Sequence, residues 1–214
     1  MLNKKNKAKR VFEKLVEKYP GAKCSLEFEN PLQLLIATQL SAQCTDKQVN
    51  KVTPGLFEKL QTASDFANVD LGEFGNLIHS TGFYKNKAKN IQAACKIISG
   101  KYNGNVPSRM EELLELPGVG RKTANVVLSE GFGVPGIVVD THVGRIAKRL
   151  GLTNEDDPVK VEFELMKLLP DFEWKKFCHV LIEHGREICM SRNPKCKECV
   201  VSDMCDLYRS NNLV

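Results

Sequence analysis

A lysine that follows a glycine-rich turn is the first feature of this sequence that could do chemistry. The stretch Leu-Pro-Gly-Val-Gly (116–120) predicts a tight connection between two helices, and Lys122 lies in the first turn of the second helix. Glycines at the mouth of a helix leave backbone N–H groups accessible, which suits a phosphate. An amine whose pKa is lowered there by the helix dipole and by partial burial could attack carbon. The alternative is an ordinary surface lysine in a first helical turn.

A carboxylate returns shortly after this lysine. Asp140 follows Gly-Val-Pro-Gly (133–136) and a short β-branched run, and it would suit covalent chemistry by an amine as a proton acceptor or electrostatic partner. It is equally the N-cap expected for a helix over 141–150. His142 and His184 are further candidate acid–base groups, although each falls in a helical pattern that is typical of a buried histidine.

Four of the eight cysteines are packed into 17 residues near the end of the chain, with the spacing C-x6-C-x2-C-x5-C. Four thiolates so close in sequence could surround one metal centre and hold together a loop with little apolar content. The spacing alone leaves both zinc and a four-iron cluster open, since each accepts four cysteines. Unliganded thiols are the alternative that the tight clustering disfavours. The cluster consists of Cys189, Cys196, Cys199 and Cys205.

Charge and composition indicate a globular chain that does not span a membrane. The net charge is +5, from 31 Lys and Arg against 26 Asp and Glu, and no apolar run reaches the length of a membrane span. Residues 1–23 hold eight basic side chains against Glu13 and Glu17, which fits a polyanionic partner or a solvated end equally well. The charged N-terminus lacks the apolar core of a signal peptide, so we expect a cytoplasmic protein with no targeting signal.

The elements that must position these residues are helical almost throughout, since only 137–139 resembles a strand. Asn30-Pro31 predicts a helix start, and two capping boxes, Thr45 with Gln48 and Ser108 with Glu111, predict two more. We expect Gly100 to end a helix that begins near Asn86. The periodicity predicts helices over residues 7–18, 31–40, 46–60, 70–79, 86–99, 109–114, 121–131, 141–150, 158–169 and from 173.

The motifs LPGVGRKTANVV and VVDTH, together with the cysteine cluster, resemble the endonuclease III family of helix-hairpin-helix DNA glycosylases. LLIATQLSAQCTD and TGFYKNKAKNI fit the same family, so the resemblance extends over nearly the whole chain. It implies an all-α fold in two parts with a DNA cleft between them. The expected parts are a six-helix barrel over 24–134, with its helix-hairpin-helix at about 109–131, and an iron–sulfur cluster domain formed by 1–23 and 135–214, with the cluster loop at 189–205.

The resemblance also implies an activity and a site. The family acts in base excision repair on double-stranded DNA, removing oxidised pyrimidines such as thymine glycol and cleaving abasic sites, and it carries a [4Fe–4S] cluster. By position, Lys122 would be the nucleophile that forms a Schiff base for β-elimination, and Asp140 would assist it. The implied DNA contacts are Gln43 (gap filling), Phe83 (wedge), Gly118, Val119, Gly120, Arg121, Arg192 and Lys195; the carbonyls of Leu114, Leu116 and Val119 match those that hold an ion in relatives.

Other functions stay open on the sequence alone. A monofunctional glycosylase would lack the lyase step, although relatives of that kind lack a lysine at the position of Lys122. A DNA-binding module or an electron carrier would use the hairpin or the cysteine cluster without the amine. Cys44 and Thr81 depart from the residues expected at their positions. We expect a monomer that associates with the nucleoid in a prokaryote.

Overall fold

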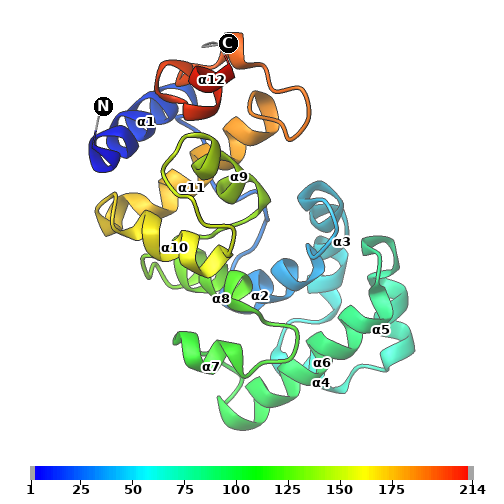
Figure 1. The fold of residues 1–214 in the computed structure, drawn as a ribbon. Coiled ribbons are helices and arrows are strands. Elements are labelled where there is room, and N and C mark those ends of the chain that lie inside the picture. The colour runs from blue at the N-terminus through cyan, green and yellow to red at the C-terminus, as the bar shows by residue number, and fades with distance from the viewer. Residues whose placement is uncertain (1–2, 212–214) are drawn as a thin grey trace. The chain divides into compact units, whose positions relative to one another are not determined.

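The computed structural model describes residues 3–211, and within them the chain forms helices and no strands. The chain divides into two compact units, one formed by Cys24–Val134 and the other by Met1–Lys23 together with Pro135–Val214. Figure 1 shows the course of the chain through these helices. Each unit has its own apolar core, so each positions its candidate residues by its own packing.

The unit of residues 24–134 is built around α2 (Pro31–Leu40), which has no polar face. Every residue from Leu34 to Leu40 is buried, as expected for a helix that is apolar all round. The Asn30 side chain caps its first turn by accepting a hydrogen bond from the Gln33 amide at 3.0 Å. The other elements are α3 (Asp46–Lys59), α4 (Ala63–Asn68), α5 (Leu71–Leu77), the 3-10 turn η1 (His79–Thr81), α6 (Tyr84–Lys101), α7 (Met110–Leu114), α8 (Arg121–Val126) and the π-helical turn η2 (Val127–Gly131).

The other unit packs its N-terminal helix against its C-terminal helices, as Figure 1 shows for α1 (Lys4–Lys18) and α11 (Asp171–Glu187). Phe12 and Phe177 meet edge to face at this contact, with ring centroids 6.1 Å apart. The remaining elements are α9 (Thr141–Arg149), α10 (Pro158–Met166), the 3-10 turns η3 (Cys196–Glu198) and η4 (Ser202–Met204), and α12 (Asp206–Asn211).

Several basic residues of α1 join it to the end of the same unit. Lys7 is 9% exposed, and its ammonium donates to the Leu150 carbonyl at 2.8 Å and to Asp206 at 2.7 Å. Lys14 bonds the Val200 carbonyl at 3.1 Å. Part of the positive charge that the sequence concentrates at the N-terminus therefore has an internal partner.

Most of the expected helices are confirmed, and the differences have physical causes. The predicted strand at 137–139 is irregular chain: Ile137 is fully buried and the Val138 amide donates to the Cys178 sulfur at 3.3 Å. Gly100 does not end its helix, which continues to Lys101 before the chain turns at Gly104 with φ +81°. The short helix α4 was not predicted, because six residues carry too little periodicity to detect.

The two predicted capping boxes form only in part or not at all. The Thr45 hydroxyl caps α3 as expected by accepting a hydrogen bond from the Gln48 backbone amide, but the Gln48 side chain does not close the box, because its Nε2 donates to Ser80 Oγ at 2.9 Å. The helix expected after Ser108 begins one residue later than that cap requires, at Met110, and no side chain caps it. The box at Ser108 and Glu111 is therefore wrong.

Candidate functional site

The glycine-rich turn joins α7 to α8 and is fixed by close packing. Gly118 has φ +76°, and a Cβ atom on it would lie 2.8 Å from Gln39 Oε1 and 3.0 Å from Asn90 Cβ. Only glycine satisfies both the left-handed backbone and this close approach. Leu116 and Val119 are buried on either side, and the Val119 amide donates to the Leu116 carbonyl at 3.0 Å. The sequence LPGVG therefore forms one rigid turn against α2 and α6.

Lys122 lies at the second position of α8, two residues after Gly120, and its side chain is exposed. The partial burial that one of the two interpretations of Lys122 required is not observed, because α8 turns Ala124 and Asn125 into the core instead. Gly120 is the N-cap residue of α8, and no side chain caps that end. The backbone amide groups of the first turn of α8 are therefore not bonded by a side-chain cap. The same turn carries the exposed amine of Lys122.

Two loops of the same unit each contain an exposed residue, other than glycine, whose backbone is in the left-handed region. Gln43 follows α2 and has φ 54°, and Phe83 precedes α6 and has φ 49°. The left-handed region is rarely occupied by residues other than glycine, and least readily by a bulky one. Phe83 is also 64% exposed, which costs the apolar contacts that a phenyl ring normally makes. Strained, exposed residues of this kind are typical of functional sites.

Asp140 lies in the unit that contains α9, and it caps that helix as predicted. Its Oδ1 accepts hydrogen bonds from the amides of His142 and Val143, both at 2.8 Å. Both bonds use the same oxygen, and within residues 3–211 no further hydrogen bond is made to Oδ2. The carboxylate can therefore cap a helix and act on a second partner at once.

The two histidines are packed into this unit, as their helical pattern indicated. Burial lowers the pKa of His142, which lies against α11 so closely that a Cβ on Gly185 would meet its Nδ1 at 2.5 Å. Arg145 bonds His142 Nδ1 at 3.1 Å and donates to the Cys189 carbonyl at 2.9 Å. His184 is 1% exposed, and burial lowers its pKa to about 4. Both rings are therefore neutral near pH 7.

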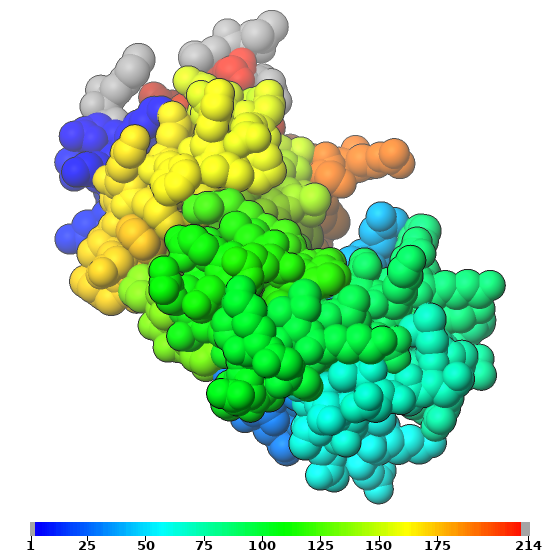
Figure 2. All heavy atoms as spheres, turned by 90° about the horizontal axis from the view of Figure 1, so that it is seen from below, coloured from blue at the N-terminus to red at the C-terminus, as the bar shows by residue number. Residues whose placement is uncertain are grey.

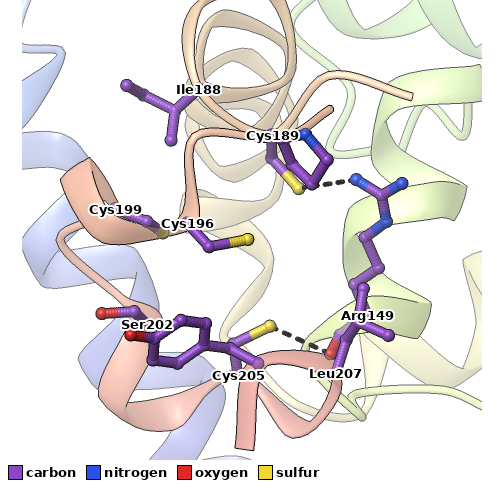
Figure 3. Close-up of a pocket in the computed structure, with 10 residues that line it drawn as sticks. Arg149, Ile188, Cys189, Cys196, Cys199, Ser202, Cys205 and Leu207 are labelled. Atoms are coloured by element: carbon purple, nitrogen blue, oxygen red, sulfur yellow. Dashed lines mark hydrogen bonds between the residues drawn. The ribbon is translucent and has the colours of Figure 1, made fainter. Parts of the chain in front are cut away.

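The four clustered cysteines line one pocket, and Figure 3 shows the sulfur atoms of Cys189, Cys196 and Cys205 directed into it. Three of these cysteines have hydrogen-bond partners. Arg149 Nη1 donates to the Cys189 sulfur at 3.3 Å, and the Cys205 thiol donates to the Arg149 carbonyl at 3.3 Å. A third contact joins Cys199 to His184 Nε2 at 3.4 Å. Of these contacts, the one from Arg149 to Cys189 is an N–H···S bond of the kind that stabilises a thiolate.

The geometry of these thiols fits a cluster better than a single ion. Across residues 3–211, no three Cys, His, Asp or Glu side chains converge closely enough to hold one metal ion. A zinc ion would require sulfur atoms about 2.3 Å from one point, whereas a four-iron cluster spreads its four thiolates apart. Burial raises the pKa of Cys199 to about 11, so this thiol ionises near pH 7 only with a bound cationic centre beside it.

The loop between the first two of these cysteines projects from its unit, and Figure 2 shows the orange stretch of this region standing out from the surface. Arg192 and Lys195 are both exposed on it. Asn193, between them, has φ 50°, and the Lys195 amide donates to the Ile188 carbonyl at 2.9 Å. The two basic side chains are thus presented to solvent on a loop whose ends are fixed.

Comparison with known proteins decides the family. Residues 36–171 match the HhH-GPD superfamily of base excision DNA repair proteins, and residues 189–205 match the iron–sulfur binding domain of endonuclease III. The chain is 53% identical to endonuclease III of Synechocystis sp. over 206 residues, covering 96% of this chain and 94% of that one. This chain belongs to the endonuclease III family. It is 47% identical to the Bacillus subtilis endonuclease III over 194 residues, 90% of this chain and 89% of the relative.

Solved structures agree with this assignment. A non-covalent endonuclease III–DNA complex matches with a TM-score of 0.93 at 46% identity, over 100% of both chains. A trapped covalent endonuclease III–DNA intermediate matches with the same score and identity, over 99% of this chain and 100% of that one. The protein is accordingly a base excision repair enzyme, a DNA glycosylase with abasic-site lyase activity, and DNA is its partner. The predicted all-α helix-hairpin-helix glycosylase fold is confirmed.

A [4Fe–4S] cluster is the cofactor of this chain, and the match at 189–205 spans the four cysteines from the first to the last. The pocket that these four cysteines line agrees with this cofactor. None of the helices in that range is long and apolar enough to cross a membrane.

Sequence reasoning missed two kinds of residue. Arg145 and Arg149 bind backbone and sulfur atoms around Cys189, and the signal available was their spacing on the helix that Asp140 caps. Lys87 is buried at 7% exposure, although it lies in the stretch TGFYKNKAKNI, where it is one of three lysines with no distinguishing pattern.

Proposed function

We propose that Lys122 is the nucleophile of this glycosylase and lyase. The observation that carries the proposal is its exposed amine in the first turn of α8, directly after a turn that Gly118 fixes against α2 and α6. The damaged nucleotide leaves the base stack, because its C1′ atom cannot be reached inside the duplex. The neutral amine then forms a bond to C1′ as the bond from C1′ to the base breaks, and the base departs with a proton.

The lyase step follows from the same bond. Opening of the sugar ring gives an imine between Lys122 and C1′, which makes the C2′ proton acidic. Removal of that proton breaks the C3′–O bond by β-elimination, so the strand is cut, and water then releases the sugar fragment from the lysine. No oxidant or reductant is consumed.

Asp140 is proposed to assist Lys122 through the oxygen that does not cap α9. It would accept a proton from the ammonium of Lys122 or stabilise the positive charge that develops on the sugar. Because Lys122 and Asp140 belong to different units, this role requires both units to act on one nucleotide. The two units are proposed to correspond to the barrel domain (24–134) and the iron–sulfur domain (1–23 with 135–214) of the family.

Gln43 and Phe83 are proposed to act on the duplex that remains. Gln43 would fill the gap left by the extruded nucleotide, and Phe83 would insert as a wedge that stacks on the exposed bases. Their left-handed backbone and their exposure support this, since both features are costly in a protein that does not use them.

The phosphate contacts are proposed for the hairpin and for the projecting loop. The backbone of Gly118, Val119 and Gly120, together with Arg121, would meet the strand beside the extruded nucleotide. Arg192 and Lys195 would add a contact whose strength falls with salt. The carbonyls of Leu114, Leu116 and Val119 are proposed as ligands of an ion that bridges the hairpin to a phosphate.

The substrates are proposed to be duplexes that contain an oxidised pyrimidine or an abasic site, bound by a monomer that acts on nucleoid DNA. Release of thymine glycol from a duplex by the purified chain tests the base class, and light scattering of the DNA complex tests the monomer. Failure to release any oxidised pyrimidine would leave only abasic-site cleavage.

Borohydride trapping on abasic DNA tests the nucleophile. The native chain is expected to form a covalent adduct, Lys122→Ala is expected to form none, and Lys96→Ala, an exposed lysine on α6, serves as the matched control. Unchanged trapping by Lys122→Ala would assign the chemistry to another amine. Loss of DNA binding together with cleavage would make Lys122 a phosphate contact instead.

A further inference from the structure

A buried ammonium lies behind the two loops that carry Gln43 and Phe83. Lys87, on the first turn of α6, is 7% exposed and meets no carboxylate within hydrogen-bond distance among residues 3–211. Its Nζ donates to the Leu40 carbonyl at 2.7 Å and to the Thr81 carbonyl at 2.8 Å. Burying an ammonium costs free energy, so we expect Lys87 to have a role beyond packing.

The two acceptors identify that role. Leu40 is the last residue of α2 and lies three residues before Gln43, whereas Thr81 ends η1 and lies two residues before Phe83. One side chain therefore holds the bases of both loops. Beyond each base the chain enters a left-handed conformation, at φ 54° for Gln43 and φ 49° for Phe83.

A second, exposed link joins the same two loops. Gln48 Nε2, on the first turn of α3, donates to Ser80 Oγ at 2.9 Å. This bond lies on the solvent side, where water competes with it, and it is weaker for that reason. The buried bonds of Lys87 to two carbonyls are charge-assisted and are the stronger of the two links.

We propose that Lys87 is a positioning residue that makes the Gln43 loop and the Phe83 loop a single rigid device for insertion into DNA. Strained residues at loop tips relax unless the surrounding structure fixes them, and a tip that relaxes cannot wedge base pairs apart. Lys87 fixes both tips from one point, so neither loop moves without the other. This inference rests on the proposed roles of Gln43 and Phe83 and is independent of Lys122.

The test uses the holoenzyme and a duplex with an uncleavable abasic analogue opposite 2-aminopurine, whose fluorescence reports insertion at that position. Lys87→Met keeps the length of the side chain and removes the donor, and Lys96→Met removes a charge from an exposed position on the same helix. Cleavage of a true abasic site is measured in parallel, in a duplex and in a single strand, because a single strand has no opposite base to displace.

With Lys87→Met at saturating protein, we expect less than about half of the native fluorescence change and roughly a 10-fold slower cleavage of the duplex, as the loss of a charge-assisted bond implies. Cleavage of the single strand should stay within about 2-fold of the native rate, since the substitution does not change how the Lys122 amine is positioned. Lys96→Met should match the native enzyme in every assay.

Two results would overturn the proposal. One is a native fluorescence change with Lys87→Met; the other is an equal loss of cleavage on duplex and single strand, which would make Lys87 a general scaffold residue. If Lys122 were not the nucleophile, cleavage by the native chain would depend on another amine, and Lys122→Ala would still cleave, while the fluorescence assay would still decide the role of Lys87. If Lys87→Met does not fold, Gln48→Ala decides by the same duplex-to-single-strand ratio, with a loss of about 3-fold expected on the duplex alone.

Discussion

Replacing Gly118 by alanine should separate the two reasons for which the hairpin needs glycine. The first is the backbone: an alanine held at φ +76° costs about 1 kcal/mol relative to glycine. The second is space: the added Cβ would lie 2.8 Å from Gln39 Oε1 and 3.0 Å from Asn90 Cβ. Neighbours must shift, and overpacking of this kind costs about 1–3 kcal/mol. The total expected destabilisation is about 2–4 kcal/mol.

Two other glycines serve as controls for the two terms. Gly104 has φ +81° but nothing within 4 Å of the added Cβ, so Gly104→Ala should show the backbone cost alone. Gly55 lies inside α3 with neither constraint, and Gly55→Ala should stabilise the protein by about 0.5–1 kcal/mol.

Thermal unfolding of the three holoenzyme variants measures these costs, since 1 kcal/mol corresponds to about 2–4 °C for a chain of this size. Binding to abasic-analogue DNA should weaken for Gly118→Ala and remain native for the other two. An unfolding temperature for Gly118→Ala equal to that of Gly104→Ala would refute the claim that the close approach to α2 and α6 fixes the hairpin.

The remaining predictions concern the other unit, the buried thiol and the cofactor. Lys7→Met should destabilise the protein by about 2–3 kcal/mol in chemical unfolding, because it leaves the Leu150 carbonyl without its buried donor, while Lys9→Met should be neutral. Burial lowers the pKa of His142, so the unfolded chain takes up a proton first as pH falls through about 6.5, and stability should fall below that pH; a His142→Gln variant with the same pH dependence would contradict this. Burial raises the pKa of Cys95 to about 12, so alkylation at pH 8 should modify it only in the unfolded chain, as mass spectrometry would detect. The holoenzyme should be brown and contain iron and inorganic sulfide, and Cys196→Ser should lose both; a colourless native protein with one zinc would contradict the cluster.

Local signals in the sequence predicted most of the helices. Asn30-Pro31 and Asp140 each act within three residues of themselves, through an N-cap and a restricted φ, so the sequence contains all that is needed to place them. The strand expected at 137–139 failed for the opposite reason. Its β-branched residues are apolar because Ile137 is buried in the core of its unit, and this packing is not visible locally.

The candidate site likewise contains some residues that could be predicted from the sequence and others that could not. The cysteine cluster and the LPGVG turn are contiguous in the sequence and could be predicted from spacing and residue type. The buried lysines could not, because their partners are distant: Lys87 bonds a carbonyl 47 residues away, and Lys7 bonds a carboxylate 199 residues away. From the sequence alone a lysine is expected at the surface, because acceptors that are distant in the sequence become apparent only in the folded structure.

Peptide mapping of the borohydride-trapped complex tests the central claim most directly. After digestion of protein and DNA, mass spectrometry should find the sugar remnant on the ε-amine of Lys122, within the α8 peptide, and on no other residue. A remnant on a different lysine or on the N-terminal amine, or no remnant at all on a chain that cleaves abasic DNA, would contradict the assignment of Lys122 as the nucleophile.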